Sequence, residues 1–322
     1  AVLRYAVEDG KEPMHPGTGI YAHNPKEAGE AYYAVTLSVG GKENRELGAG
    51  NALKEAVKET VGPGPFILQR VEKPKSFTYV ENPELRYYVR WEAPPNCNVP
   101  SRPFDYLVAI PAQLAKPAPV GIHLHCWGGN VLSGYGWWYM AEKGALLIAT
   151  NQIPYDWWTG YHELLGKKPR TENDWKGGVI RPYTPNRRFS FFEWVTTKWE
   201  VDRTRTFLAG NSMGGSGAVM LALRYGDRVA WATSWVGVHD PGNTPQFTGS
   251  YENSYGMKAW GLKFEDGTPV FDYYKDAWFL RKYPAQETAF VTFSNGKNDG
   301  AIGWPQAVEF LRALQETKRP HL

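Results

Sequence analysis

The segment TFLAGNSMGGSGAVMLALRY, Thr206–Tyr225, gives the clearest indication of the fold. It opens with a short apolar run that predicts a buried strand, and it closes with a run rich in alanine and leucine that predicts a helix. Between them GNSMG, residues 210–214, matches the pattern G-x-S-x-G. A strand, a sharp turn and a helix in this order lift a serine hydroxyl above a sheet. Ser212 is therefore the predicted nucleophile, and a structural glycine-rich turn is the alternative.

Strands and helices alternate on both sides of this stretch. Apolar runs predict strands over 87–91, 106–110, 120–124, 145–150, 229–238 and 289–294. Helical patterns fall at 137–143, 191–199 and 307–315. Such alternation is typical of a mostly parallel sheet with helices on both faces. The predicted fold class is α/β.

A serine hydroxyl becomes a nucleophile when a base removes its proton and an acid orients that base. In this fold the acid and the histidine follow the serine along the chain. Asp299, just after the expected strand 289–294, is the predicted acid, and Asp240 is the alternative acid. Asp299 could instead have a purely structural role in an Asx turn. His321 follows Asp299 but stands where the next strand should begin. We therefore expect the base to be His321 or a histidine beyond Leu322.

The reaction also needs donors for the negative charge that develops on the substrate oxygen. The backbone N–H of Met213, directly after the nucleophile, is the first predicted donor. The second is expected in HCWGG, residues 125–129, after the strand 120–124. Trp127 is favoured by position and Gly128 comes second, while an ordinary glycine turn is the alternative interpretation.

Composition excludes several classes of protein. The 322 residues carry 36 Lys and Arg against 33 Asp and Glu, a near-balance that gives no reason to expect nucleic acid or a membrane surface as partner. Two cysteines, Cys97 and Cys126, cannot build a disulfide framework or a four-ligand zinc site, and their pairing stays open. Tryptophan is abundant at 14 residues. Trp157 and Trp158 follow an expected strand, and we predict that they bind substrate, with core packing as the alternative.

The N-terminal part has a different character. AYYAVTLSV, residues 31–39, is rich in β-forming residues and is followed by Gly40-Gly41, a tight-turn signal. Residues 1–62 thus resemble part of a fibronectin type III or immunoglobulin-like β domain. The predicted organisation is this segment, a linker at 63–75, and a catalytic domain at 76–322 that is expected to lack its C-terminal end.

The catalytic part resembles the α/β-hydrolases, and within them the feruloyl esterases, acetyl-xylan esterases and polyhydroxybutyrate depolymerases. The resemblance is carried by residues 194–230, WVTTKWEVDRTRTFLAGNSMGGSGAVMLALRYGDRVA, and by the oxyanion loop, which is similar to the HGGG type with Cys126 and Trp127 in place of two glycines. It implies a covalent acyl-serine that water hydrolyses, without a metal or organic cofactor. It further implies a small-molecule or polysaccharide ester as substrate and a secreted or periplasmic location.

Two other functions stay open at this point. A serine peptidase of the prolyl-oligopeptidase type shares the serine turn and often carries an N-terminal β domain. A non-catalytic polysaccharide-binding homologue that has lost its base would keep the fold. The oligomeric state is not indicated by the sequence.

Overall fold

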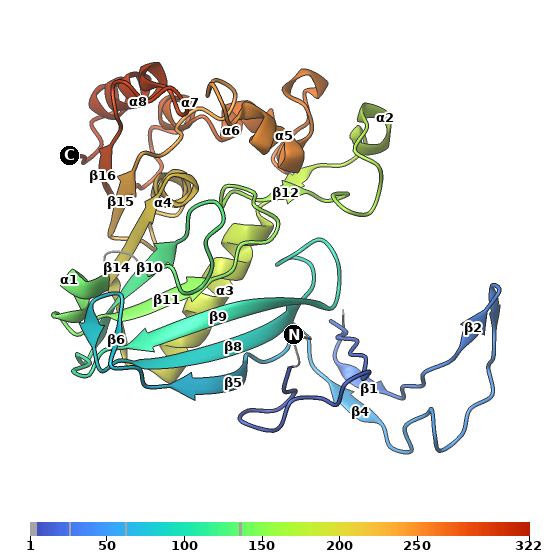
Figure 1. The fold of residues 1–322 in the computed structure, drawn as a ribbon. Helices are drawn as coiled ribbons and strands as arrows, with labels where there is room; N and C mark the ends of the chain where they lie inside the picture. The colour runs from blue at the N-terminus through green and yellow to red at the C-terminus, as the bar shows by residue number, and fades with distance from the viewer. Residues whose placement is uncertain (1–4, 26, 62, 135–136) are drawn as a thin grey trace.

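The computed structural model describes residues 5–25, 27–61, 63–134 and 137–322. In this part of the chain an eight-stranded sheet has the order β16-β15-β14-β10-β11-β9-β8-β5 (Figure 1). Its strands are β5 (Ile67–Glu72), β8 (Glu84–Glu92), β9 (Arg102–Ile110), β10 (Ala118–Leu124), β11 (Leu146–Thr150), β14 (Val201–Asn211), β15 (Trp231–Trp235) and β16 (Phe290–Ser294). The five from β10 onward run parallel, whereas β9, β8 and β5 are antiparallel to their neighbours. The prediction of an α/β fold with a mostly parallel sheet is confirmed.

The helices cover both faces of the sheet. On one face lie α3 (Tyr183–Lys198), α4 (Met213–Arg224), α7 (Asp276–Lys282) and α8 (Trp304–Glu316), whose apolar side chains share one core cluster with the sheet. On the other face α1 (Trp137–Ala141) and the hairpin β6–β7 (Ser76–Phe77, Val80–Glu81) enclose a smaller cluster. Alternate residues of β9 divide between the two, Tyr106 and Val108 in the first cluster and Leu107 and Ala109 in the second. Every residue of β10 and β11 is buried, which explains why these two central strands are largely apolar.

Shorter elements fill the connections. These are β12 (Tyr161–His162), α2 (Glu172–Trp175), β13 (Ile180–Arg181), α5 (Thr248–Tyr255), the 3-10 helix η1 (Lys258–Trp260) and α6 (Val270–Tyr273). Both cysteines are free thiols, and Cys97 is buried. Among the described residues, no helix has the length and apolar character that a membrane crossing requires.

The start of the sheet differs from expectation. The range 63–75, expected as a linker, contains β5, which pairs with β8 and is an edge strand of the main sheet. Residues before it also pack on this edge, because the Ala6 N–H donates to Gln69 Oε1 at 2.9 Å and the Leu68 N–H donates to Asp9 Oδ1 at 2.8 Å. The sheet unit therefore takes in residues on both sides of the expected boundary.

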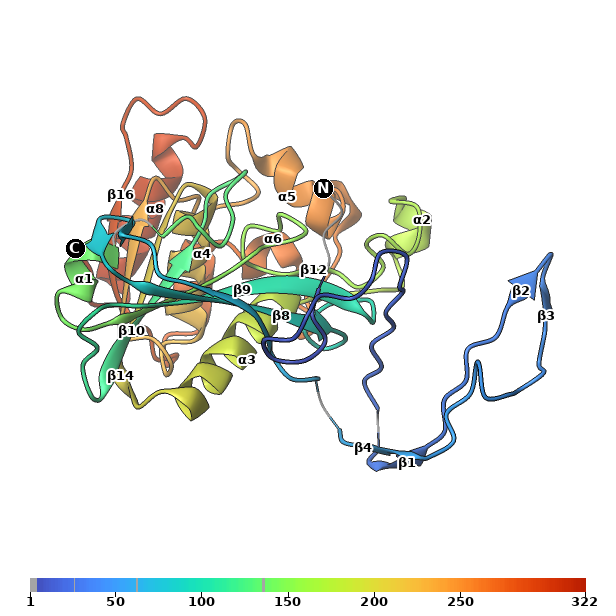
Figure 2. The same cartoon turned by 60° about the horizontal axis from the view of Figure 1, so that its bottom comes forward.

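Residues 29–59 form a ribbon that extends away from the sheet (Figures 1 and 2). Two short pairs hold it, β1 (Gly29–Ala31) with β4 (Val57–Glu59) and β2 (Ser38–Val39) with β3 (Lys42–Glu43). The predicted tight turn at Gly40-Gly41 joins β2 and β3, and both glycines have positive φ, 57° and 77°. The strand expected over 31–39 is broken, and Val35 is 78% exposed. The ribbon encloses no core cluster, so the fibronectin-like interpretation is not confirmed.

Candidate active site

Ser212 lies at the turn between β14 and α4, as the sequence predicts. Its backbone has φ 52° and ψ −119°, a strained conformation for a residue with a side chain. The turn is fixed on both sides, since the Ser212 N–H donates to Trp235 O at 2.8 Å and the Ser216 N–H donates to Ser212 O at 2.9 Å. The side chain does not cap α4 and is only half-buried. The serine hydroxyl is thus presented at the carboxyl edge of the sheet.

The glycines around Ser212 are required by close packing. A Cβ on Gly214 would lie 1.9 Å from Leu124 O, at the end of β10, and a Cβ on Gly210 would lie 2.3 Å from the carbonyl carbon of Gly214. Further along α4, a Cβ on Gly217 would lie 2.4 Å from Trp158 Cβ. Real Cβ atoms do not approach neighbours so closely. These contacts press the start of α4 against the loop that follows β10.

That loop carries the predicted oxyanion donors. Gly128 has φ 77°, and the Gly129 N–H closes a turn onto Cys126 O at 2.9 Å. Within the described chain, the N–H groups of Trp127 and Gly128 donate to no protein acceptor. Met213 is the first residue of α4, where backbone N–H groups have no partner inside the helix. The structure therefore brings unused donors from both predicted sources to neighbouring places at this edge.

His125 fixes the same loop as a neutral imidazole. Its Nδ1 lies 2.9 Å from Cys126 O, and its Nε2 accepts the Gln152 N–H at 3.1 Å. These partners define a tautomer with the proton on Nδ1. Burial lowers the pKa of His125 to about 4. Both ring nitrogens are engaged, so His125 is a structural part of the loop and not the base.

Trp158 ties the loop to the nucleophile helix. Its indole N–H donates to His125 O at 3.1 Å, while its Cβ faces Gly217 of α4. Asp156 holds the backbone of Trp158, accepting its N–H at 3.0 Å on Oδ1 and the Thr184 hydroxyl at 2.6 Å on Oδ2. Burial raises the pKa of Asp156 to about 6. Sequence reasoning missed this network, because nothing in the sequence shows that residue 158 contacts residues 125 and 217.

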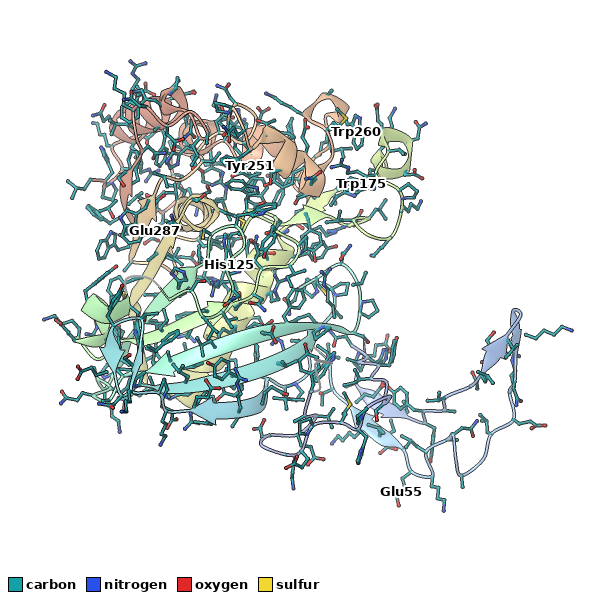
Figure 3. All side chains as sticks on the ribbon, viewed as in Figure 1. Glu55, His125, Trp175, Tyr251, Trp260 and Glu287 are labelled. Atoms are coloured by element: carbon teal, nitrogen blue, oxygen red, sulfur yellow. The ribbon has the colours of Figure 1, made fainter. Side chains whose placement is uncertain are left out.

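The prediction that Trp157 and Trp158 bind substrate is wrong. The two side chains are 1% and 0% exposed, because left-handed backbone at both residues (φ 59° and 66°) turns them into the core. Trp157 stacks on Tyr251 at 4.5 Å between ring centroids. Trp127 is the exposed ring of this region at 51%, and it packs on Tyr155 at 4.7 Å. Figure 3 shows the side chains crowded around His125 and Tyr251.

Asp299 follows β16 at the same edge of the sheet as Ser212. Its Oδ1 accepts the N–H groups of Ala301 and Ile302 at 2.8 and 3.1 Å. This oxygen forms an Asx turn, which is the structural role considered for Asp299 as an alternative to catalysis. Among the described residues, no imidazole contacts the carboxylate. The alternative acid, Asp240, is held by Lys275 at 3.1 Å. Asp299 is in the place that a triad acid requires, and its catalytic role stays a prediction.

The structure does not bring His321 to Ser212. His321 pairs in parallel with Val291, which lies opposite Ala232, which lies opposite Leu208. It therefore sits in the row of Leu208, four residues before Ser212, and beyond β16 on the sheet edge. With about 3.3 Å per residue and about 4.8 Å per strand, the separation is roughly 20 Å. The assignment of His321 as the base is wrong, because a residue bridged to the edge strand β16 in the row of Leu208 lies far from the carboxyl ends of the strands.

No other histidine of the described chain contacts the serine hydroxyl. His239, after β15, is buried with Nδ1 at 3.2 Å from Asp276 and Nε2 at 3.3 Å from Asn295. His162 is buried and stacked on Trp175 at 4.4 Å. His123 is buried within β10, and burial lowers its pKa to about 3. The candidate site thus brings together the predicted nucleophile, the predicted oxyanion donors and the predicted acid, and no imidazole of the described residues is assigned to it.

Comparison with protein families gives one match. Residues 168–321, slightly less than half of the chain, match the Esterase family. The matched region includes the serine turn, Asp299 and His321. No curated protein matches the chain at a significant level.

Solved structures reproduce the fold. An S-formylglutathione hydrolase from Agrobacterium tumefaciens superimposes with a TM-score of 0.54 at 15% identity, covering 79% of this chain and 88% of its own. A protein described as a dipeptidyl aminopeptidase IV from Bacteroides ovatus gives 0.51 at 15% identity over 74% of this chain. This chain spans only 31% of that protein's length. At such identity the structures show the α/β-hydrolase fold alone. The Esterase match and the serine turn support the prediction of a serine ester hydrolase.

Proposed function

We propose that this chain is the catalytic part of a serine hydrolase that cleaves carboxylic esters linked to carbohydrates. The observation that carries the proposal is the strained turn at Ser212, set against a loop whose Trp127 and Gly128 N–H groups have no protein acceptor. Strain of this kind costs about 1–3 kcal/mol and persists where the surrounding structure holds it for a function.

The proposed reaction has two steps. Ser212 Oγ attacks the carbonyl carbon of the ester, its proton passes to a base, and the N–H groups of Met213 and Trp127 or Gly128 stabilise the oxyanion. The alcohol leaves with a proton, and water then cleaves the acyl-serine to release the acid. Asp299 is proposed to orient the base. We assign the role of base to none of the histidines of residues 5–322.

The test uses an activated aryl acetate, free imidazole and two variants. We expect slow hydrolysis by the unmodified chain, because a serine beside an oxyanion site retains part of its catalysis without the base. Added imidazole should raise this rate, and Ser212→Ala should abolish the enzyme-dependent increase. Ser38→Ala, in the exposed ribbon, is the control that should change neither rate.

A panel of acetyl, feruloyl and aminoacyl-proline substrates then fixes the class. Faster turnover of the acetyl or feruloyl sugar esters supports the proposal. Turnover confined to the aminoacyl-proline substrate would indicate a peptidase. Hydrolysis that survives Ser212→Ala, or polysaccharide binding with no Ser212-dependent rate, would overturn the proposal, the second result in favour of a non-catalytic binding protein.

A further inference from the structure

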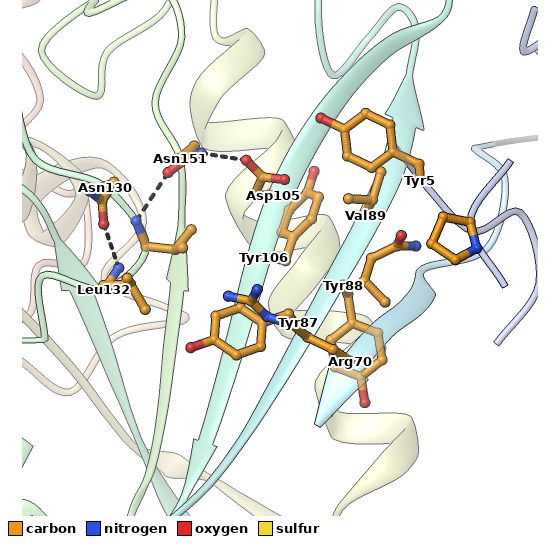
Figure 4. A pocket seen from close by; sticks show the side chains of 13 residues that line it. Tyr5, Arg70, Tyr87, Tyr88, Val89, Asp105, Tyr106, Asn130, Leu132 and Asn151 are labelled. Carbon is orange, nitrogen blue, oxygen red and sulfur yellow. Dashed lines mark hydrogen bonds between the residues drawn. The ribbon is translucent and has the colours of Figure 1, made fainter. Parts of the chain in front are cut away.

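A cavity of about 420 Å³ lies on the face of the sheet opposite α3 (Figure 4). Its floor is formed by Tyr87 and Val89 of β8 and Asp105 of β9. One wall is Tyr5 from the N-terminal segment, and the other is Leu132 from the loop that follows β10. Three separate parts of the chain therefore meet around this space.

The N-terminal wall is fastened to the sheet. The Tyr5 ring packs edge-on against Trp91 at 5.6 Å between centroids, and Ala6 is bonded to the Gln69 side chain in both directions, at 2.9 and 3.1 Å. The Gly10 N–H also donates to Leu68 O at 3.1 Å. These contacts fix the position of the N-terminal segment on the sheet, so the wall of the cavity that it forms is fixed as well.

The polar groups of the cavity leave hydrogen-bonding capacity free. Asn151 donates to Asp105 Oδ2 at 2.6 Å and accepts the Val131 N–H at 3.0 Å, which fixes the carboxylate and the loop together (Figure 4). Asp105 Oδ1 accepts no hydrogen bond from the described residues. Across the floor, the Arg70 guanidinium lies 4.2 Å from the Tyr87 ring centroid, with Nε 3.2 Å from Glu72. An acceptor and a cationic donor thus face one space beside apolar side chains.

The cavity opens on the same edge of the sheet as the nucleophile. The Asn151 N–H donates to Asp105 O at 3.1 Å just beyond the carboxyl end of β11, in line with the end of β10. Asp105 and Ser212 are separated by three strand spacings, from β9 through β11 and β10 to β14. At about 4.8 Å each, this is roughly 14 Å. The loop from His125 to Leu132 joins the oxyanion donors to the cavity wall.

We infer that this cavity is a distal sugar subsite. It binds an uncharged sugar unit of a glycan while Ser212 acts on an ester carried by another unit of the same glycan. Sugar hydroxyls can donate to Asp105 and accept from Arg70, and the C–H face of the ring can pack on Tyr5 and Leu132. Asp105 disfavours an anion and Arg70 disfavours a cation, so a neutral polyol is the class that fits. The link to catalysis rests on the proposed function, but the binding itself does not.

Binding is therefore measured without catalysis. The probe is a linear xylo-oligosaccharide that carries no ester, titrated into the Ser212→Ala chain and followed by calorimetry and NMR. We expect saturable binding that Asp105→Asn weakens about tenfold, since one acceptor oxygen becomes a donor while the Asn151 contact can be kept. Leu132→Ala, a change at a 45% exposed rim position, should weaken it several-fold without affecting folding. Glu55→Gln in the ribbon is the matched carboxylate control and should change nothing.

The result that would overturn the inference is no binding to the folded Ser212→Ala chain, or binding that neither Asp105→Asn nor Leu132→Ala alters. The proposed function fails separately, through a hydrolysis rate that does not depend on Ser212. A chain that binds the sugar but has no Ser212-dependent rate would keep the subsite and lose the esterase.

Discussion

The serine turn and the N-terminal ribbon are both rich in glycine. In the turn the glycines are required by close packing, whereas in the ribbon they lie in open space. At the turn, Gly210 and Gly214 have backbone atoms within 1.9 to 2.3 Å of where a Cβ would stand. In the ribbon, Gly48 and Gly50 have no atom within 4 Å of that place. Figure 3 shows the same contrast in the side chains, which are dense around His125 and sparse near Glu55.

The two regions are therefore stabilised by different means. The serine turn is held in its strained conformation by the close packing of β14, α4 and the loop after β10. The energetic cost of the strain is offset by these packing contacts. The ribbon is held by a few backbone pairs, and its apolar residues, such as Leu37 at 69% exposure, lie in solvent. Substitutions should therefore have large effects in the first region and small effects in the second.

The largest effect is expected for Gly214→Ala. The added methyl would overlap Leu124 O, and because the obstacle is backbone the strand and helix must move apart. We expect a loss of at least about 3 kcal/mol in the free energy of unfolding, measured by denaturant titration. Gly50→Ala, the matched ribbon change, should shift it by less than about 0.5 kcal/mol. Equal effects of the two would contradict the comparison.

The pH dependence of stability should come in part from His125. Its pKa in the folded state, about 4, is below the ordinary value of 6.5, so the unfolded chain binds the proton more readily. The contribution is fully present above pH 6.5 and is lost as the pH falls toward 4, amounting to about 3 kcal/mol. Nitrogen NMR of the imidazole should show a neutral ring with its proton on Nδ1 at pH 6. An imidazolium signal at that pH would contradict the lowered pKa, and a neutral ring with its proton on Nε2 would contradict the assigned tautomer.

A smaller effect is expected for Trp158→Phe. The change keeps an aromatic ring against Gly217 but removes the donor to His125 O, which leaves a buried carbonyl without its partner. We expect a loss of about 1–2 kcal/mol in stability and about a tenfold fall in the Ser212-dependent rate, as the oxyanion loop loosens. Trp278→Phe, on α7 and half-buried, is the control for losing an indole. A rate equal to that of the control would show that Trp158 contributes only packing and that its hydrogen bond to His125 O does not affect catalysis.

Most of the fold could be predicted from the sequence. The apolar runs placed β10 and β11 within a few residues, because both strands are buried along their whole length. They also marked β14, β15 and β16, although β14 begins at Val201, five residues before the predicted run. At the antiparallel edge, the runs at 87–91 and 106–110 predict parts of β8 and β9, whereas β5 falls in the predicted linker. β5 has a buried residue at one end and exposed polar residues at the other. Single short strands with mixed polarity have too little periodicity to identify.

The position of Ser212, the predicted nucleophile, follows from the sequence, since a strand, a G-x-S-x-G turn and a helix leave one place for it. The sequence also determined the neighbourhood of the oxyanion donors, because the carboxyl ends of parallel strands meet at one edge. Only the tertiary structure decided that Trp157 and Trp158 turn inward, that Trp158 holds His125, and that His321 lies in the row of Leu208. These facts depend on contacts between residues far apart in the chain and on strand register. Residue type and local spacing do not encode either of them.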